Sequence, residues 1–200
     1  MITIFMLVMT MAQTQPVSEI LQAKYSRNEQ RVEEILRSGI ELNVFEAAAT
    51  GQTARVRALL AADPGLVNAH APDGFFPLAL AVFFGNAETA AALLDAGADV
   101  NLQSRESMKI AALHSAIAVR RVDLVRMLLD RGADPGVRAA GGPTPLHAAA
   151  QSGQVDLAGL LLDHGADVNA PDEGDRTPLG YAIEAKRDAI VALLRERGGR

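Results

Sequence analysis

The sequence predicts an all-α solenoid, a stack of helix-turn-helix repeats. The leucine that opens the first helix of each repeat recurs at intervals of 35, 33 and 33 residues, at Leu78, Leu113, Leu146 and Leu179. The glycine that closes each repeat recurs at the same intervals, at Gly97, Gly132, Gly165 and Gly198. The helices between these landmarks are shorter than the roughly 12 to 15 residues that an isolated helix needs in water. Each repeat must therefore bury its apolar side against a copy of itself.

The composition fits this fold and excludes several classes of site. The 200 residues are 49% hydrophobic and only 4% aromatic, which suits closely stacked short helices better than a β-sandwich. The net charge of −5 lacks the basic balance of a nucleic-acid-binding protein, and no nucleic acid is expected as a partner. The absence of cysteine excludes disulfides, thiolate zinc sites and a cysteine nucleophile.

Residues 1–15 are expected to form an apolar or disordered N-terminal segment, and the sequence allows three interpretations of its role. Met1 to Ala12 is too short to span a bilayer, so no membrane span is expected. Thr10 and Ala12 would suit a signal cleavage site, but no Lys or Arg precedes Lys24. The segment is a signal, a disordered tail, or the product of a start codon placed before Met11. We expect a cytoplasmic location, with export to the periplasm as the alternative if residues 1–12 act as a signal.

Two helical pairs precede the regular repeats. Residues 16–42 contain apolar residues at helical spacing and a stop at Gly39, and they form a degenerate N-terminal pair. A second pair covers Val44 to Thr50 and Ala54 to Ala62. Residues 63–65, Asp-Pro-Gly, end that pair, and a turn follows. Both pairs lack the Thr-Pro-Leu-His opening of the later units.

The unit from Thr144 to Asn169 shows how each repeat is built. Thr144 is a suitable N-cap and Pro145 suits the first helical position, so a short inner helix is expected from Leu146 to Ser152, stopped by Gly153. The leucines from 157 to 162 then predict an outer helix that ends at Gly165.

The units resemble ankyrin repeats in several motifs that stand in phase. These are Thr144-Pro145-Leu146-His147, Thr177-Pro178-Leu179, Ala112-Leu113-His114, Gly97-Ala98-Asp99-Val100-Asn101, Gly132-Ala133-Asp134 and Gly165-Ala166-Asp167-Val168-Asn169. The resemblance implies antiparallel helix pairs, with β-turn segments that project from the stack as fingers. Residues 43–200 would form this domain, with about four repeats. The last is expected to be a capping repeat, since Arg195 stands where Leu94, Leu129 and Leu162 stand in the others.

No catalytic or metal-binding motif is present. His114 and His147 occupy the family's structural position, where imidazole can bridge backbone groups of adjacent turns, and neither has a second ligand at metal spacing. The Asp99-x-Asn101 and Asp167-x-Asn169 pairs suit hydrogen bonds within their own turns better than calcium. No cofactor, metal site or enzymatic activity is therefore expected.

The resemblance also implies where a partner binds. The family's contact positions fall on the finger tips and on the concave face formed by the inner helices. In this chain they are Asp73, Phe75, Phe83, Phe84, Arg105, Glu106, Met108, Lys109, Gln151, Ser152, Arg176 and Glu184.

Four of the six phenylalanines, Phe75, Phe76, Phe83 and Phe84, lie in one repeat. Buried aromatic side chains concentrate binding energy at interfaces. We expect Phe75 and Phe83 to be exposed, whereas Phe76 and one helix phenylalanine can equally fill gaps beside small alanines. The finger from Arg105 to Lys109 is longer than the others and is the second candidate.

The sequence thus indicates a non-catalytic protein-protein interaction module that binds a folded protein partner and is itself a monomer. The alternative is an accessory or inhibitory subunit of an enzyme, with export as an option. The sequence does not identify the partner.

Overall fold

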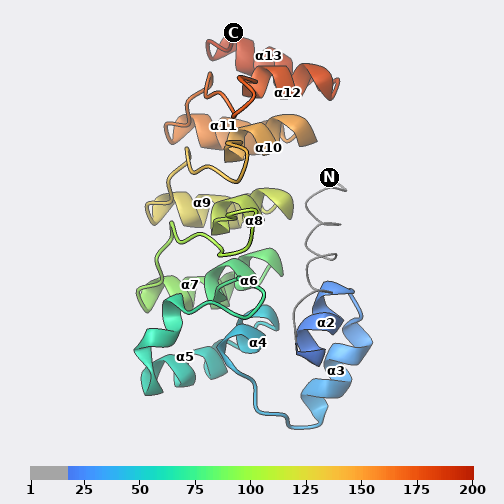
Figure 1. Cartoon of the computed structure of the whole chain (residues 1–200), viewed down its shortest axis with the longest axis vertical. Coiled ribbons are helices and arrows are strands. Elements are labelled where there is room, and N and C mark those ends of the chain that lie inside the picture. The colour runs from blue at the N-terminus through green and yellow to red at the C-terminus, as the bar shows by residue number, and fades with distance from the viewer. Residues whose placement is uncertain (1–17) are drawn as a thin grey trace. The chain divides into compact units, whose positions relative to one another are not determined.

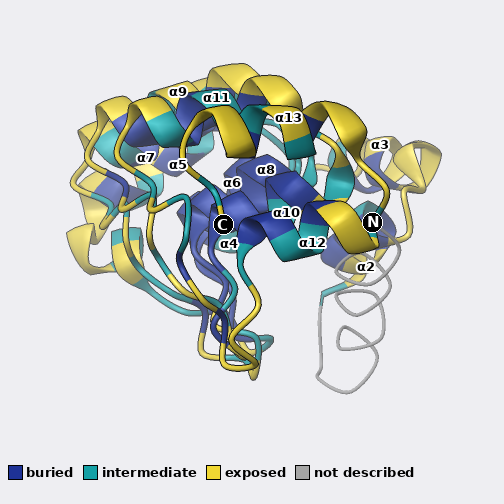
Figure 2. Ribbon diagram, turned by 90° about the horizontal axis from the view of Figure 1, so that it is seen from above, coloured by how far each residue is buried: buried dark blue, intermediate teal, exposed yellow. Residues whose placement is uncertain are grey.

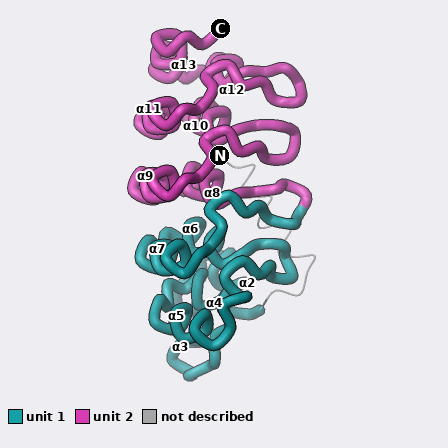
Figure 3. The backbone as a smooth tube through the Cα atoms, turned by 90° about the vertical axis from the view of Figure 1, so that its left-hand side faces the viewer, with its two compact units in different colours: residues 1–106 teal, residues 107–200 magenta. Residues whose placement is uncertain are grey.

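A computed structural model describes residues 18–200 and shows helices with no strand among them (Figure 1). The chain divides into two compact units, residues 1–106 and residues 107–200 (Figure 3). Each unit is built from helix pairs, in which the first helix is called inner and the second outer. The predictions made for residues 1–15 concern residues outside the described part.

From residue 18 onward, the first unit contains three helix pairs. Its elements are α2 (Glu19–Tyr25), α3 (Glu29–Arg37), α4 (Val44–Ala49), α5 (Thr53–Ala62), the 3-10 helix η1 (Pro64–Asn68), α6 (Pro77–Phe83) and α7 (Ala87–Asp95). Inner helices α4 and α6 pack side by side, and so do outer helices α5 and α7. Three consecutive alanines of α4, Ala47 to Ala49, are fully buried, because small side chains let the inner helices approach closely.

The second unit continues the same pattern with three regular pairs. They are α8 (Ala112–Ala118) with α9 (Val122–Asp130), α10 (Pro145–Ser152) with α11 (Val155–Asp163), and α12 (Pro178–Glu184) with α13 (Asp188–Glu196). Helix α10 packs between α8 and α12, and α11 packs between α9 and α13. Figure 2 shows that the inner helices are mostly buried, while the outer helices expose one side. The predicted stacked helix-turn-helix fold is therefore confirmed.

One leucine position recurs in the outer helices with a common structural role. The outer-helix leucines of the four regular repeats are completely buried, at Leu93, Leu128, Leu161 and Leu194. The next position is less uniform: Leu129 is buried, Leu94 and Leu162 are half-buried, and Arg195 is exposed, as its charge predicts. The period in the sequence thus reflects a leucine position that is fully buried in the outer helix of each regular repeat.

The fingers are joined to one another by backbone hydrogen bonds. In the second unit, the Ala140 N–H donates to the Met108 carbonyl at 2.9 Å, and the Glu173 N–H donates to the Gly141 carbonyl at 2.9 Å. In the first unit, the Arg105 N–H donates to the Gly74 carbonyl at 3.0 Å. These bonds satisfy backbone groups that would otherwise need water, so each finger is held by its neighbour.

Candidate functional site

The phenylalanine cluster of the first unit is more buried than expected. Phe75 is only 9% exposed, so its predicted exposure is wrong. The carbonyl of Phe75 accepts a hydrogen bond from the Ala71 N–H at 2.7 Å, which places the residue at the base of the finger instead of its tip. Phe76 is 1% exposed and belongs to the core, whereas Phe83 and Phe84 are half-buried. A contact between Phe75 and a partner stays a prediction, and the exposure of Phe75 does not support it.

The other predicted contact residues lie at or near the surface. The exposed ones are Arg105, Lys109, Gln151, Arg176 and Glu184, and the half-buried ones are Asp73, Phe83, Phe84, Glu106, Met108 and Ser152. Several of them already have partners within the chain. The Ser152 hydroxyl donates to the Ala148 carbonyl, and the Glu106 carboxylate accepts from the Ser104 hydroxyl at 2.7 Å. Their role toward a partner is untested.

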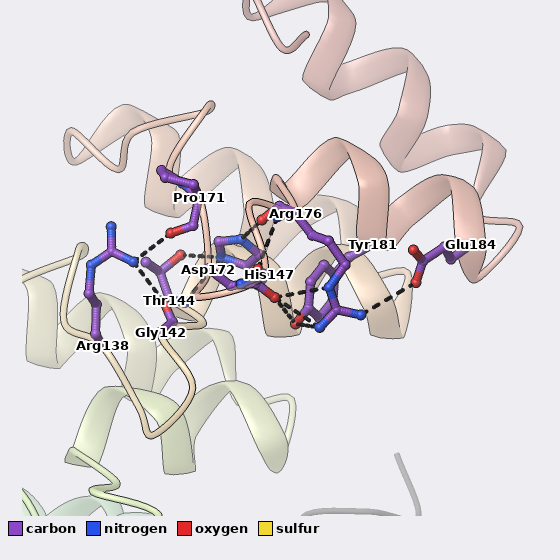
Figure 4. A network of polar contacts seen from close by, with 10 residues as sticks. Arg138, Gly142, Thr144, His147, Pro171, Asp172, Arg176, Tyr181 and Glu184 are labelled. Atoms are coloured by element: carbon purple, nitrogen blue, oxygen red, sulfur yellow. Dashed lines mark hydrogen bonds and ion pairs between the residues drawn. The ribbon is translucent and has the colours of Figure 1, made fainter.

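A polar network around Asp172 fixes the finger of the last repeat (Figure 4). One oxygen of Asp172 accepts from the Gly174 and Arg176 N–H groups at 2.8 and 2.9 Å. The other accepts from the Tyr181 hydroxyl at 2.7 Å and from the Arg176 guanidinium at 2.9 and 3.1 Å. The guanidinium also lies 4.5 Å from the Tyr181 ring centroid and 3.8 Å from Glu184. Arg176 is thus held in one orientation, although its side chain is half exposed.

The network has a defined ionisation state. Burial of the Asp172 side chain opposes its charge, but hydrogen bonds from the Arg176 backbone, Tyr181, Gly174 and the Arg176 side chain prevail and lower its pKa well below the usual range. Burial, followed by the hydrogen bond to Asp172, raises the pKa of Tyr181 to about 12. At neutral pH the carboxylate therefore accepts and the phenol donates.

Asp172 and Tyr181 were missed by the sequence analysis, although a signal existed. The chain has two tyrosines, Tyr25 and Tyr181, and each donates its hydroxyl to an aspartate of a finger. Rarity alone could have drawn attention to both. The aspartates that accept these hydrogen bonds could not be identified from the sequence, because no motif marks them.

Two side chains at the starts of outer helices reach the inner helix of the preceding repeat. In the first unit, the Asn86 amide donates to the Ala48 and Ala49 carbonyls, each at 2.9 Å. In the second unit, the Arg187 guanidinium donates to the Gln151 carbonyl at 3.2 Å. Both bonds satisfy carbonyls at the end of an inner helix.

The structural role expected of the histidines is confirmed for His147. The Thr144 N–H donates to its Nδ1 at 3.1 Å, and its Nε2 lies 3.0 Å from the Arg176 carbonyl, to which it donates. His147 therefore joins its own repeat to the next finger. At His114 the Ala111 N–H donates to Nδ1 at 3.3 Å. His70 is half-buried, and its Nε2 lies 3.1 Å from the Gln103 carbonyl.

Acid should destabilise the chain through these buried imidazoles. Burial lowers the pKa of His114 to about 4 and also lowers the pKa of His147. The unfolded chain binds a proton near the ordinary value of about 6.5, so the stability due to neutral His114 is complete above that pH and is lost as pH falls toward about 4. The denaturant midpoint of unfolding should therefore fall as the pH is lowered through this window. The fall should be smaller in His114→Asn than in wild type. Exposed His164→Asn serves as the control, and an equal fall in all three proteins would contradict the assignment.

The Asp-x-Asn pairs form hydrogen bonds within their own turns, as expected. Asp99 Oδ1 accepts from the Asn101 N–H, and Asp167 Oδ1 accepts from the Asn169 N–H, both at 2.9 Å. Among residues 18–200 no group of three or more His, Asp or Glu side chains is placed to hold a metal ion. Within that same range no helix has the length and apolar character needed to cross a bilayer.

Comparisons with known proteins point to one family. A family model of ankyrin repeats in three copies matches residues 44–139 and 113–200. The human 2-5A-dependent ribonuclease is 45% identical over 53 residues, which are 26% of this chain and 7% of that protein. The match therefore spans a small part of the ribonuclease.

Proposed function

We propose, from the premise that this chain belongs to the ankyrin repeat family, that it is a non-catalytic module that binds a folded protein partner through its finger tips and inner-helix faces. Ankyrin repeats are generally protein-protein interaction modules, and their fold is typically non-catalytic. The ribonuclease activity in the name of the human relative is not carried over, because the match covers 7% of that protein.

The fixed orientation of Arg176 is the observation that carries this proposal. Its guanidinium is held by Asp172 and Tyr181, while its side chain stays 50% exposed. A side chain that is already ordered loses little conformational entropy when a partner binds. Arginine and tyrosine are also enriched among the residues that dominate binding energy.

The surface around Arg176 has a mixed character that suits a protein partner. Glu184, at the end of inner helix α12, lies exposed 3.8 Å from the Arg176 guanidinium. Gln151 lies exposed at the end of the preceding inner helix α10. A partner surface that offers a carboxylate to Arg176 and a basic group to Glu184 would complement this region.

Affinity capture with matched variants tests the proposal. We expect Arg176→Ala combined with Glu184→Ala to weaken binding of the captured protein by about tenfold or more, since ordered arginines contribute strongly to interfaces. The control combines Arg126→Ala with Asp156→Ala, which removes the same charges from exposed positions on outer helices α9 and α11. Equal losses in both proteins, or no loss in either, would contradict the proposed surface.

A further inference from the structure

The first helix pair departs from the repeat pattern. Only residues 38–43 connect α3 to α4, so no finger forms between them, whereas residues 131–144 connect α9 to α10. Helix α2 packs on α4, but α3 has no packing against α5 comparable to that of α5 against α7. Figures 1 and 2 place α2 and α3 beside α4, on the side away from α5. The pair therefore lies by the inner-helix face of the first unit.

The last turn of α2 contacts two of the residues predicted to bind a partner. The Tyr25 hydroxyl donates to Asp73 Oδ2 at 3.1 Å, and the Tyr25 ring centroid lies 5.6 Å from that of Phe84. Lys24 Nζ lies 5.1 Å from the Phe84 ring centroid and 3.2 Å from Glu29. Phe83 packs edge-on against Phe84, with their centroids 5.1 Å apart. We call Asp73, Phe83 and Phe84 the α6 surface.

We propose that the α6 surface binds a partner segment in which a basic residue precedes a tyrosine at the end of a helix, and that Lys24 and Tyr25 occupy this place in the free protein. The inference rests on the proposed function and adds the chemistry of the partner. Binding then requires the partner to displace α2 from the α6 surface.

The chemistry follows from the groups that α2 now satisfies. The face of an aromatic ring attracts a cation, so Phe84 accepts an ammonium or guanidinium group. Asp73 Oδ1 already accepts the Phe75 N–H at 3.2 Å, which orients the carboxylate and leaves Oδ2 for a hydroxyl donor. A second aromatic ring packs at an offset against Phe84. A basic residue followed by tyrosine supplies all three contacts at once.

The α2–α3 pair is suited to displacement. Among residues 18–200 the helices of this pair pack mainly on one neighbouring pair, through α2 on α4, and such a pair opens at a lower free energy than pairs packed on both sides. Helices α2 and α3 are each too short to persist alone in water. The connecting segment exposes Ile40, which is 52% exposed, and leaves the pair tethered to α4 after it opens.

A labelled synthetic peptide of residues 18–38 is the probe for the full-length protein. In wild type this probe competes with the protein's own α2. Lys24→Ala combined with Tyr25→Phe weakens that internal contact, so we expect the double variant to bind the probe about tenfold more tightly, as the binding-competent fraction rises. Adding Asp73→Asn to the double variant should remove this gain. Gln22→Ala, an exposed change on the same helix, is the matched control and should leave affinity unchanged.

Two further measurements make the result decisive. A probe with the same two substitutions should bind the double variant about tenfold more weakly than the unmodified probe, because it lacks the cation and the hydroxyl. Amide exchange should increase in residues 19–37 of the double variant and stay unchanged in residues 44–106, which also shows that the variant is folded. Equal probe affinity for wild type and the double variant overturns the inference.

The two proposals fail in different ways. If partner affinity falls in the Arg176 and Glu184 variant but is unchanged in the Lys24 and Tyr25 variant, the proposed function stands and this inference is overturned. Partner binding that is strengthened in the Lys24 and Tyr25 double variant supports the inference. If partner affinity is unchanged in the Arg176 and Glu184 variant, but the probe binds the Lys24 and Tyr25 variant more tightly as expected, only the proposed surface of the second unit is contradicted.

Discussion

Leu161→Ala is expected to lower the free energy of unfolding by about 3 to 4 kcal/mol, which is typical of a fully buried leucine. Leu161 is 0% exposed on α11, and α11 packs between α9 and α13. Because both neighbours hold the helix in place, the structure cannot collapse into the space left by the missing atoms. Most of the cavity should persist, so its cost adds to that of the lost apolar burial.

Chemical denaturation followed by far-UV circular dichroism measures this effect. Val155→Ala is the control, since Val155 begins the same helix but is 36% exposed. Its cost should be below about 1 kcal/mol, as is usual for surface positions. Similar losses in the free energy of unfolding for the two substitutions would show that α9 and α13 do not hold α11 in a fixed position.

The fold could be predicted because the same packing requirement acts on every repeat. Leu161 and its equivalents are buried in the same way, so their spacing records the distance along the chain from one repeat to the next. The inner helix expected from Leu146 to Ser152 begins one residue earlier, at Pro145, and ends at Ser152 before Gly153, as predicted. His147 bridges two turns because its repeat position requires it.

The candidate site was predicted less well, because exposure depends on tertiary contacts that have no period. The position of Phe75 in its repeat suggested a finger tip, but the finger's own hydrogen bonds place it at the base. The contact of Tyr25 with Asp73 joins residues 48 positions apart. It depends on a helix pair that leaves the stack, and the repeat pattern contains no information on where such a pair lies.

Gly142→Ala is expected to cost about 3 kcal/mol, of which about 1 comes from the left-handed backbone and about 2 from overpacking. Gly142 has a φ of 87°, and an added Cβ would lie 2.8 Å from the Glu173 backbone nitrogen. That nitrogen cannot easily move away, since its N–H donates to the Gly141 carbonyl and the adjacent Asp172 is fixed by its own hydrogen bonds. The strain must therefore appear as lost stability.

Gly165→Ala separates the two contributions. Gly165 has a φ of 89°, but no atom lies within 4 Å of an added Cβ, so only the backbone cost of about 1 kcal/mol remains. Denaturation of both variants under the same conditions gives the difference directly. A difference near 2 kcal/mol means that neighbouring fingers are rigidly joined and present one continuous surface. Equal costs would mean that the fingers of residues 139–143 and 172–176 are not rigidly joined and move independently.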